Sequence, residues 1–366
     1  MVEMGHRVMR WMGYGALFVA MLIVVVWAAV LKHEHRSTQF VCSLDVNISG
    51  GGACPLADVE SIDKWIREHG LYAEDMRVES LQVGAIERTT LAHSAVESAN
   101  AFVNYDGSVI VDVELRTPIA RLRIDGYDMY ITEDGFLLPM VKDRTAAVPV
   151  ITGGYKPLFR PDYSGYAAQV VRDSIASLEA HIESLEDAKL PYYRMLDTND
   201  SELRQVINNR VRKGLFMSKE EYKILVEDYE RRRVAARERH TAKKREIEAA
   251  IADLGRQQQE ARLKQHMVES AGDDFEALLG FLKGIDQSKF WQAEIVQILL
   301  SGGTTEPMEL GFVPRSGRFV VDLGMVTELD GKLANLYRFY NNGLDKLGWD
   351  KYSRISLRYK GQVVCR

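Results

Sequence analysis

A run of alternating apolar and polar residues in the first half of the chain constrains the fold more than any other feature. Residues 109–115 alternate valine or leucine with isoleucine, aspartate and glutamate, which is the period-two pattern of a strand with one buried face. An Asp-Gly pair stands at 106–107 and another at 125–126, and such a pair between two β-prone runs predicts a tight hairpin turn. Pro118 separates the two hairpins, because proline has no N–H to donate to a ladder. The sequence therefore predicts two antiparallel modules that meet at Pro118.

Two helices are predicted ahead of the first hairpin. Apolar residues recur at helical spacing over 56–66, and a second helix is expected over 83–93. A β-prone run at 44–48 precedes both. The resulting order of strand, helix, helix, strand, strand predicts one α/β unit over residues 44–117.

An uncharged apolar run lies near the start of the chain. Residues 11–31 contain no Asp, Glu, Lys or Arg, and about 20 apolar residues span the hydrocarbon core of a bilayer. A cleaved signal peptide is the alternative, but its apolar core is usually about 7–15 residues long and ends in a small-x-small site. This run is longer and leads into VLKH at 30–33, a poor cleavage site. The sequence therefore predicts a retained transmembrane helix at 11–31, between a cytoplasmic tail of residues 1–10 and a stalk of residues 32–43.

The β-strand signals stop between residues 163 and 272. Ser218 and Glu221 have the spacing of a capping box, which opens a polar helical run to about residue 269. The middle of this run, residues 231–245, holds eight Lys/Arg and one Glu, whereas a coiled coil keeps its seam positions apolar. The sequence predicts a separable helical hairpin inserted over 163–272, with a solvated far end. A basic arm that contacts anionic lipid, cell-wall polymer or a partner is the alternative.

Several stretches carry a resemblance to a known family. The first resembles the junction between the POTRA and β domains of the FtsQ/DivIB cell-division proteins, most closely in their Bacteroidetes branch: it is VELRTPIARLRIDGYDMYITEDGFLLPM (113–140), followed by PVITG (149–153). FWQAEIVQI (290–298), the helix around Lys332 and LRYKGQVVC (357–365) resemble the β domain of the same family. The resemblance implies a single-pass membrane scaffold without catalytic activity. The helical insertion is the largest departure from the family pattern.

The predicted fold class is α+β, with a single N-terminal transmembrane helix, a POTRA-like domain and an antiparallel β domain interrupted by a long helical hairpin. The POTRA-like domain is expected over residues 44–117. The β domain is expected in two parts, 118–162 and 273–366, on either side of the insertion at 163–272. Its last part ends in two strands around Lys360-Gly361.

Motifs for catalysis and metal binding are absent from the sequence. It contains no HExxH, GxSxG or CxxC motif and no glycine-rich strand–helix fingerprint, so no enzyme activity, cofactor or metal site is predicted. A wall hydrolase with paired carboxylates is the enzyme alternative, and it would need a concave site with perturbed titratable groups. The net charge of −5 gives no sign of nucleic-acid binding. Cys42 and Cys54 could form a disulfide or remain free thiols, and Cys365 is left over in either case.

The predicted function is that of a cell-division scaffold in the inner membrane, with the N-terminus in the cytoplasm and the bulk of the chain in the periplasm. It would link the division ring to septal wall synthesis by binding FtsB/FtsL-like membrane proteins. A membrane-anchored POTRA-type adaptor in secretion or envelope assembly is the alternative. In the family, the terminal strands accept a strand from an FtsB-like partner, and a sheet edge offers unpaired N–H and C=O groups for this pairing. The residues expected to bind the partner are Leu357, Arg358, Tyr359, Gln362, Val363 and Val364.

Overall fold

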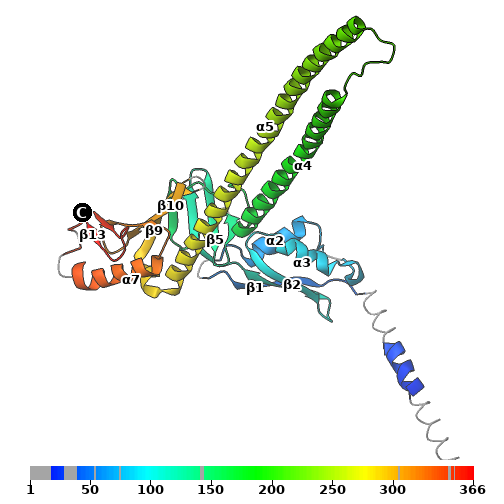
Figure 1. Cartoon of the computed structure of the whole chain (residues 1–366). Coiled ribbons are helices and arrows are strands. Elements are labelled where there is room, and N and C mark those ends of the chain that lie inside the picture. Colours follow the sequence, from blue (N-terminus) through cyan, green and yellow to red (C-terminus); the bar gives the residue numbers. More distant parts are fainter. Residues whose placement is uncertain are drawn as a thin grey trace, which may run out of the picture.

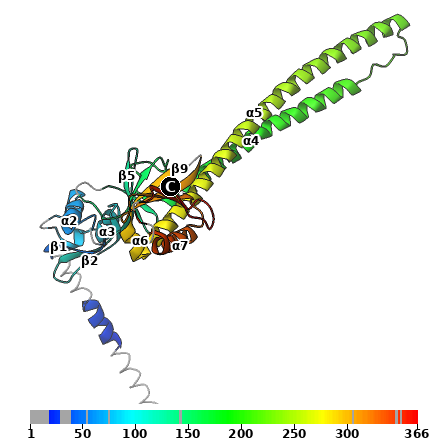
Figure 2. The same ribbon diagram turned by 90° about the vertical axis from the view of Figure 1, so that its left-hand side faces the viewer.

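The computed structural model describes residues 18–28, 39–52, 55–73, 76–140, 144–303, 306–344, 348–349 and 351–366. These residues form an α+β protein with two mixed sheets and a pair of long helices that projects from the sheets as an arm (Figure 1). The view turned by 90° shows the same arm extending away from both sheets (Figure 2).

The first sheet belongs to an α/β unit with the predicted order of strand, helix, helix, strand, strand. Its strand order is β1-β3-β2, with β1 parallel to β3 and β2 antiparallel to β3. The predicted hairpin turn between β2 and β3 is confirmed, and Gly107 adopts a φ of +91° there, which favours glycine. The elements are β1 (Ser43–Gly50), α2 (Val59–Glu68), the 3-10 turn η1 (Val78–Ser80), α3 (Val83–Leu91), β2 (Val96–Val103) and β3 (Ser108–Leu115).

The second sheet has ten strands, in the order β13-β12-β11-β10-β9-β7-β4-β5-β6-β8. The second predicted Asp-Gly turn is also confirmed, because it joins the antiparallel strands β4 and β5. The strands are β4 (Pro118–Ile124), β5 (Tyr127–Thr132), β6 (Phe136–Pro139), β7 (Val150–Gly153), β8 (Gly165–Tyr166), β9 (Ile295–Gly303), β10 (Glu306–Pro314), β11 (Val320–Met325), β12 (Arg354–Ser356) and β13 (Val364–Cys365).

This sheet is mixed, so the prediction of an antiparallel β domain is wrong. The pairs β4–β7, β7–β9 and β11–β12 run parallel. Parallel neighbours need a long crossover connection, which is commonly helical. The arm connects β7 to β9, while α7 (Leu329–Phe339) with the π-helical turn η2 (Tyr340–Leu344) connects β11 to β12. Alternation and glycine turns report strand existence but not strand direction, which is why the parallel pairs were missed.

The predicted fold class is also contradicted in its transmembrane helix. Residues 18–28 are helical and exposed, while 11–17 and 29–31 of the predicted span lie outside the described residues. Within the described ranges, no helix is long and apolar enough to cross a membrane.

Several other N-terminal predictions also fall outside the described residues. These are the tail at 1–10, residues 32–38 of the stalk, and Cys54. Cys42 is a free, exposed thiol. The neighbouring Val41 is buried and donates its N–H to the carbonyl of Met76 at 2.8 Å, so the end of the predicted stalk packs into the first unit.

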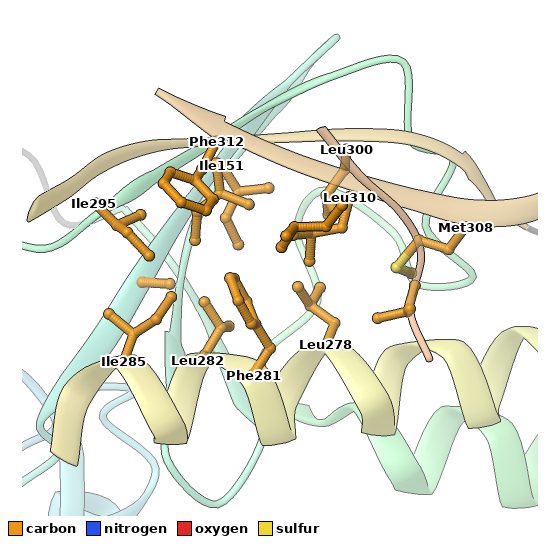
Figure 3. Close-up of a cluster of buried hydrophobic side chains, with 14 of the residues drawn as sticks. Ile151, Leu278, Phe281, Leu282, Ile285, Ile295, Leu300, Met308, Leu310 and Phe312 are labelled. Atoms are coloured by element: carbon orange, nitrogen blue, oxygen red, sulfur yellow. The ribbon is translucent and has the colours of Figure 1, made fainter. Parts of the chain in front are cut away.

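The arm consists of α4 (Ala167–Asn208) and α5 (Lys219–Gln287), and a short helix α6 (Lys289–Glu294) follows it. The predicted capping box at the start of α5 is confirmed by reciprocal bonds between Ser218 and Glu221. The last turns of α5 lie in the core of the second sheet, past the predicted boundary at 272 (Figure 3). There the buried side chains Leu278, Phe281, Leu282 and Ile285 face Ile151, Ile295, Leu300, Leu310 and Phe312.

Polar side chains hold the outer part of the arm together. Lys189 is buried, and its Nζ donates to Gln258 Oε1 at 2.6 Å and to Glu186 Oε2 at 3.0 Å. Further out, the fully buried Asn199 donates to the carbonyl of His240 at 3.1 Å and has its Oδ1 2.7 Å from His240 Nδ1. These contacts fix the register of α4 against α5 where the sequence offers few apolar residues.

Candidate partner-binding edge

The second sheet ends at β13, and in the described part of the chain this strand has one neighbour, β12. Beside β13, Arg354 and Arg366 exchange two backbone hydrogen bonds, with N···O distances of 3.1 and 2.9 Å. Hydrogen-bonded and non-hydrogen-bonded pairs alternate along an antiparallel ladder, so the next pair, Ile355 and Cys365, is non-hydrogen-bonded. The N–H and C=O of Cys365 therefore point away from β12, along an open sheet edge.

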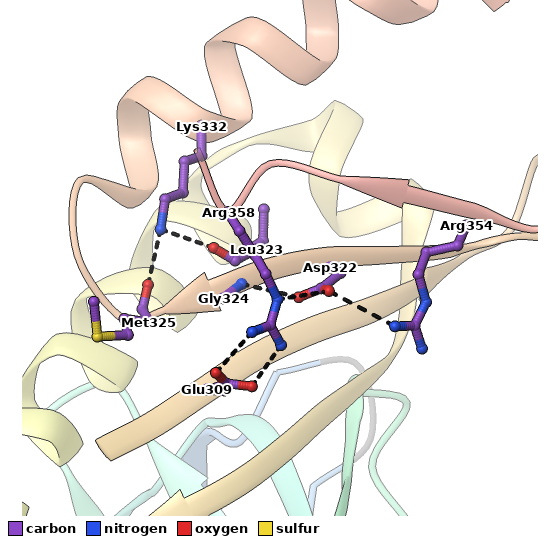
Figure 4. Close-up of polar contacts among 8 residues, drawn as sticks. All are labelled: Glu309, Asp322, Leu323, Gly324, Met325, Lys332, Arg354 and Arg358. Carbon is purple, nitrogen blue, oxygen red and sulfur yellow. Dashed lines mark hydrogen bonds and ion pairs between the residues drawn. The ribbon is translucent and has the colours of Figure 1, made fainter. Parts of the chain in front are cut away.

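Arg358 fastens the chain between these two strands to the sheet (Figure 4). Its Nη1 and Nη2 donate to the two carboxylate oxygens of Glu309 at 2.9 and 2.6 Å, and its Nε donates to Asp322 Oδ2 at 2.8 Å. Arg354 approaches the same Asp322 oxygen at 3.8 Å. The hydrogen bonds to Glu309 and Asp322 raise the pKa of Arg358. Arg358 thus binds to both β10 and β11 and holds residues 357–366, the terminal segment, on the sheet.

Lysine contacts fix the helix that precedes the edge. Lys332 of α7 donates to the carbonyls of Leu323 and Met325, both at 2.8 Å, where β11 ends (Figure 4). Burial lowers the pKa of Lys332. At the start of α7, Glu328 adopts a left-handed φ of 52° and accepts a hydrogen bond from Lys360 at 2.8 Å. A hollow of about 380 Å³ lies between α7 and the terminal segment.

Two of the six predicted partner-binding residues are engaged within the domain. Leu357 is 2% exposed and donates its N–H to the carbonyl of Asp322 at 2.7 Å. Arg358 is held by its two carboxylates, so its guanidinium is committed to the sheet. These two residues therefore stabilise the edge through contacts within the domain.

Three of the other four predicted residues are exposed, and the fourth, Val363, is half-buried. Tyr359 is 63% exposed and Val364 is 36% exposed. Gln362 is exposed, and its N–H donates to the carbonyl of Tyr359 at 3.1 Å in the turn around Gly361. Val363 packs partly against the core. The structure thus brings all six residues to one corner of the sheet. Some of them hold the terminal segment on the sheet, and others are exposed to solvent.

The sequence reasoning missed the residues that position this corner. Glu309, Asp322 and Lys332 were not singled out, although each holds the terminal segment or the helix above it. A signal was present, because Glu309 and Asp322 are carboxylates flanked by apolar residues inside mostly apolar strands. A lone charge in such a strand needs a partner of opposite charge, and the closing segment is rich in arginine.

A separate cavity of about 480 Å³ lies at the base of the arm. Its lining is mainly apolar and includes Tyr155, Phe159 and Phe275, with Asp273 and Glu276 at the same site. Burial raises the pKa of Tyr155. Among the described residues, no group of three or more His, Cys, Asp or Glu side chains could hold a metal ion. This lining suits an apolar ligand better than a polar wall polymer.

Comparison with known families addresses the C-terminal third of the chain. Residues 255–366 match the family model described as FtsQ/DivIB, C-terminal related. These residues therefore form a domain related to the C-terminal domain of FtsQ/DivIB proteins. The predicted family is thus confirmed. No curated protein matches the chain.

The FtsQ/DivIB-related domain contains the whole candidate edge. It starts inside α5 and runs through α7 to β13, so it includes both carboxylates that hold Arg358. The stretch 113–153, where the sequence also resembled the family, lies outside the match. FtsQ/DivIB proteins form a non-enzymatic family that takes part in division complexes, so the match indicates a role in cell division.

Proposed function

We propose that this protein is a division scaffold that binds an FtsB/FtsL-like partner by pairing one extended segment with the outer edge of β13. The observation that carries the proposal is the outward direction of the Cys365 N–H and C=O groups at the end of the sheet. Added strands gain affinity from backbone hydrogen bonds and specificity from side chains. Such an interaction would let the scaffold link the division ring to septal wall synthesis.

The neighbouring residues suit this role in two ways. Arg358 holds the terminal segment on β10 and β11, so the edge is ordered before a partner arrives. Tyr359 and Val364 are exposed beside that edge and offer aromatic and aliphatic contact area to the partner. The proposal assigns backbone pairing to Cys365, side-chain contact to Tyr359 and Val364, and support to Arg358.

The direction of single N–H groups gives a sharp test. Cys365→Pro removes an N–H that points outward, and proline is tolerated on an edge strand in that position. We expect it to weaken partner capture at least tenfold while the circular dichroism spectrum and the melting temperature stay unchanged. The matched variant Val364→Pro removes an inward N–H toward Ser356 and should lower the melting temperature. Capture of the partner at wild-type strength by folded Cys365→Pro protein would refute the pairing.

The proposal also puts the folded domains in the periplasm. Cys42 is exposed and gives a native handle for a topology test. In a Cys54→Ser, Cys365→Ala background, a membrane-impermeant maleimide should label Cys42 in intact spheroplasts. Labelling that occurs only after lysis would place this domain on the other side of the membrane.

A further inference from the structure

The end of the arm carries an unusual pair of side chains. Residues 209–218 join α4 to α5 and form what we call the tip loop, at the point farthest from the sheets (Figures 1 and 2). Leu215 and Phe216 in this loop are 99% and 102% exposed, the highest values among the large apolar side chains that the structure describes. Two adjacent, fully exposed apolar residues on a projecting loop mark a contact surface rather than a packing position.

The tip loop is also strongly positive. Residues 203–219 contain no Asp or Glu, and their cations are Arg204, Arg210, Arg212, Lys213 and Lys219. In the part of the chain that the structure describes, the side chains of Arg210, Arg212 and Lys213 form no ion pair or hydrogen bond. The tip loop therefore combines unpaired positive charge with exposed apolar side chains.

The basic run at 231–245, farther down α5, differs from the tip loop. Lys244 lies 3.5 Å from Asp200 of α4, and Arg232 lies 2.8 Å from Asp228. Arg233 is similarly paired within α5. These acids neutralise part of the run that looked most basic in the sequence. Three of the eight cations in the run are thus paired with acids, and what sets the tip loop apart is that its unpaired cations lie beside the exposed Leu215 and Phe216.

The shaft of the arm holds the tip loop away from the body. Residues 219–270 of α5 precede its buried base, and at about 1.5 Å per residue they span about 78 Å. Asn199 and Lys189 fasten α4 to this shaft at two levels through His240 and Gln258. A fastened shaft of this length prevents the tip from folding back to cover its apolar residues on the sheets.

We propose that the tip loop docks on a membrane surface that contains anionic lipid. Leu215 and Phe216 enter the interface between headgroups and acyl chains, and Arg210, Arg212 and Lys213 lie against the lipid phosphates. Apolar side chains flanked by cations without acids are the pattern that binds such a surface. A purely polar polyanion would leave the two apolar side chains in water. This inference stands independently of the proposed partner at β13.

The test places one fluorophore in the tip loop and one in the shaft of the full-length protein. In a Cys42→Ser, Cys54→Ser, Cys365→Ala background, Gly214→Cys and Gly255→Cys each introduce one thiol. The backbone accepts both changes, because an added Cβ at Gly214 meets only Met217 at 3.9 Å and one at Gly255 meets nothing within 4 Å. Each thiol carries an environment-sensitive dye, and vesicles of phosphatidylcholine with or without phosphatidylglycerol are added. Because each variant carries one dye, its fluorescence reports membrane contact at that position and not at other parts of the chain.

On vesicles with phosphatidylglycerol, the dye at residue 214 should shift to the blue and be quenched by spin-labelled lipid, while the dye at 255 should not respond. Replacing Arg210, Arg212 and Lys213 by glutamine should raise the lipid concentration for half-maximal response by about a hundredfold, since each cation near an anionic surface contributes on the order of 1 kcal/mol. Leu215→Ser with Phe216→Ser should raise it at least tenfold. Half-molar salt should weaken the response of the parent protein.

Three outcomes would overturn the proposal. The first is no response at residue 214 on either vesicle. The second is an equal response on neutral vesicles, which would remove the role of the cations. The third is an unchanged response in both the glutamine and the serine variants. A photo-crosslinker at residue 214 that captures a protein in cells, together with silent vesicles, would assign the tip loop to a protein partner instead.

Discussion

Truncation of Phe281 should show whether the base of the arm is part of the FtsQ/DivIB-related domain. Phe281 is 4% exposed and packs from α5 against the second sheet (Figure 3). Phenylalanine-to-alanine changes in cores cost about 3–5 kcal/mol, because transfer free energy is lost and a cavity remains. For a domain of this size, each kcal/mol shifts the melting temperature by about 2–4 °C. Phe281→Ala should therefore lower the melting temperature by on the order of 10 °C.

The matched control is Leu263→Ala, on the same helix but 58% exposed. Surface substitutions usually stay within about 0.5 kcal/mol, so this variant should melt close to the parent protein. Scanning calorimetry with near-ultraviolet circular dichroism reports the tertiary transition of the sheets rather than the loss of helix. Equal melting of the two variants would mean that the end of α5 does not fold with the second sheet, contrary to the packing described above.

Three further predictions concern other parts of the molecule. Arg358→Gln removes the arginine partner of Glu309 and leaves Asp322 with the more distant Arg354, so it should cost about 1–2 kcal/mol after allowance for exposure, and Arg358→Lys should not restore stability in urea titrations because lysine lacks the planar fork. Burial lowers the pKa of His93 below 6.5 in the folded state, so stability should be full above pH 6.5 and fall as the pH drops below it, with a smaller fall in His93→Gln. Replacing residues 194–253 with a short Gly-Ser loop should shorten the arm and leave the tertiary melting transition unchanged, and a large drop would show that the outer arm supports the sheets.

Local signals in the sequence were sufficient for the elements that depend on short-range chemistry. The Asp-Gly turns at 106–107 and 125–126 and the capping box at Ser218 appear where they were expected. Each rests on a few neighbouring residues with a defined backbone or capping preference. The same holds for the strand–helix–helix–strand–strand order of the first unit.

Long-range arrangements were not predictable in the same way. No local sequence pattern predicts that β7 lies parallel to β9, because more than a hundred residues connect these two strands. The partners of Arg358 lie on two other strands, and their spacing in the sequence has no fixed period. Asn199 and His240 are in contact because α4 and α5 pack side by side in antiparallel directions. A pattern of apolar residues along each helix does not predict such a polar contact.

The position of the arm in the sheet explains how the fold can carry it without disturbing the candidate edge. The parallel pair β7–β9 requires a crossover in any case, and only the base of this crossover packs on the sheet. A helical hairpin returns to its starting point, so its shaft can lengthen while both ends stay in place. β13 is separated from this junction by β12, β11 and β10. Because the two sites share no side-chain partner and lie far apart, substitutions in the tip loop and at Cys365 should have additive effects, and lipid docking should leave the affinity of β13 for its partner unchanged.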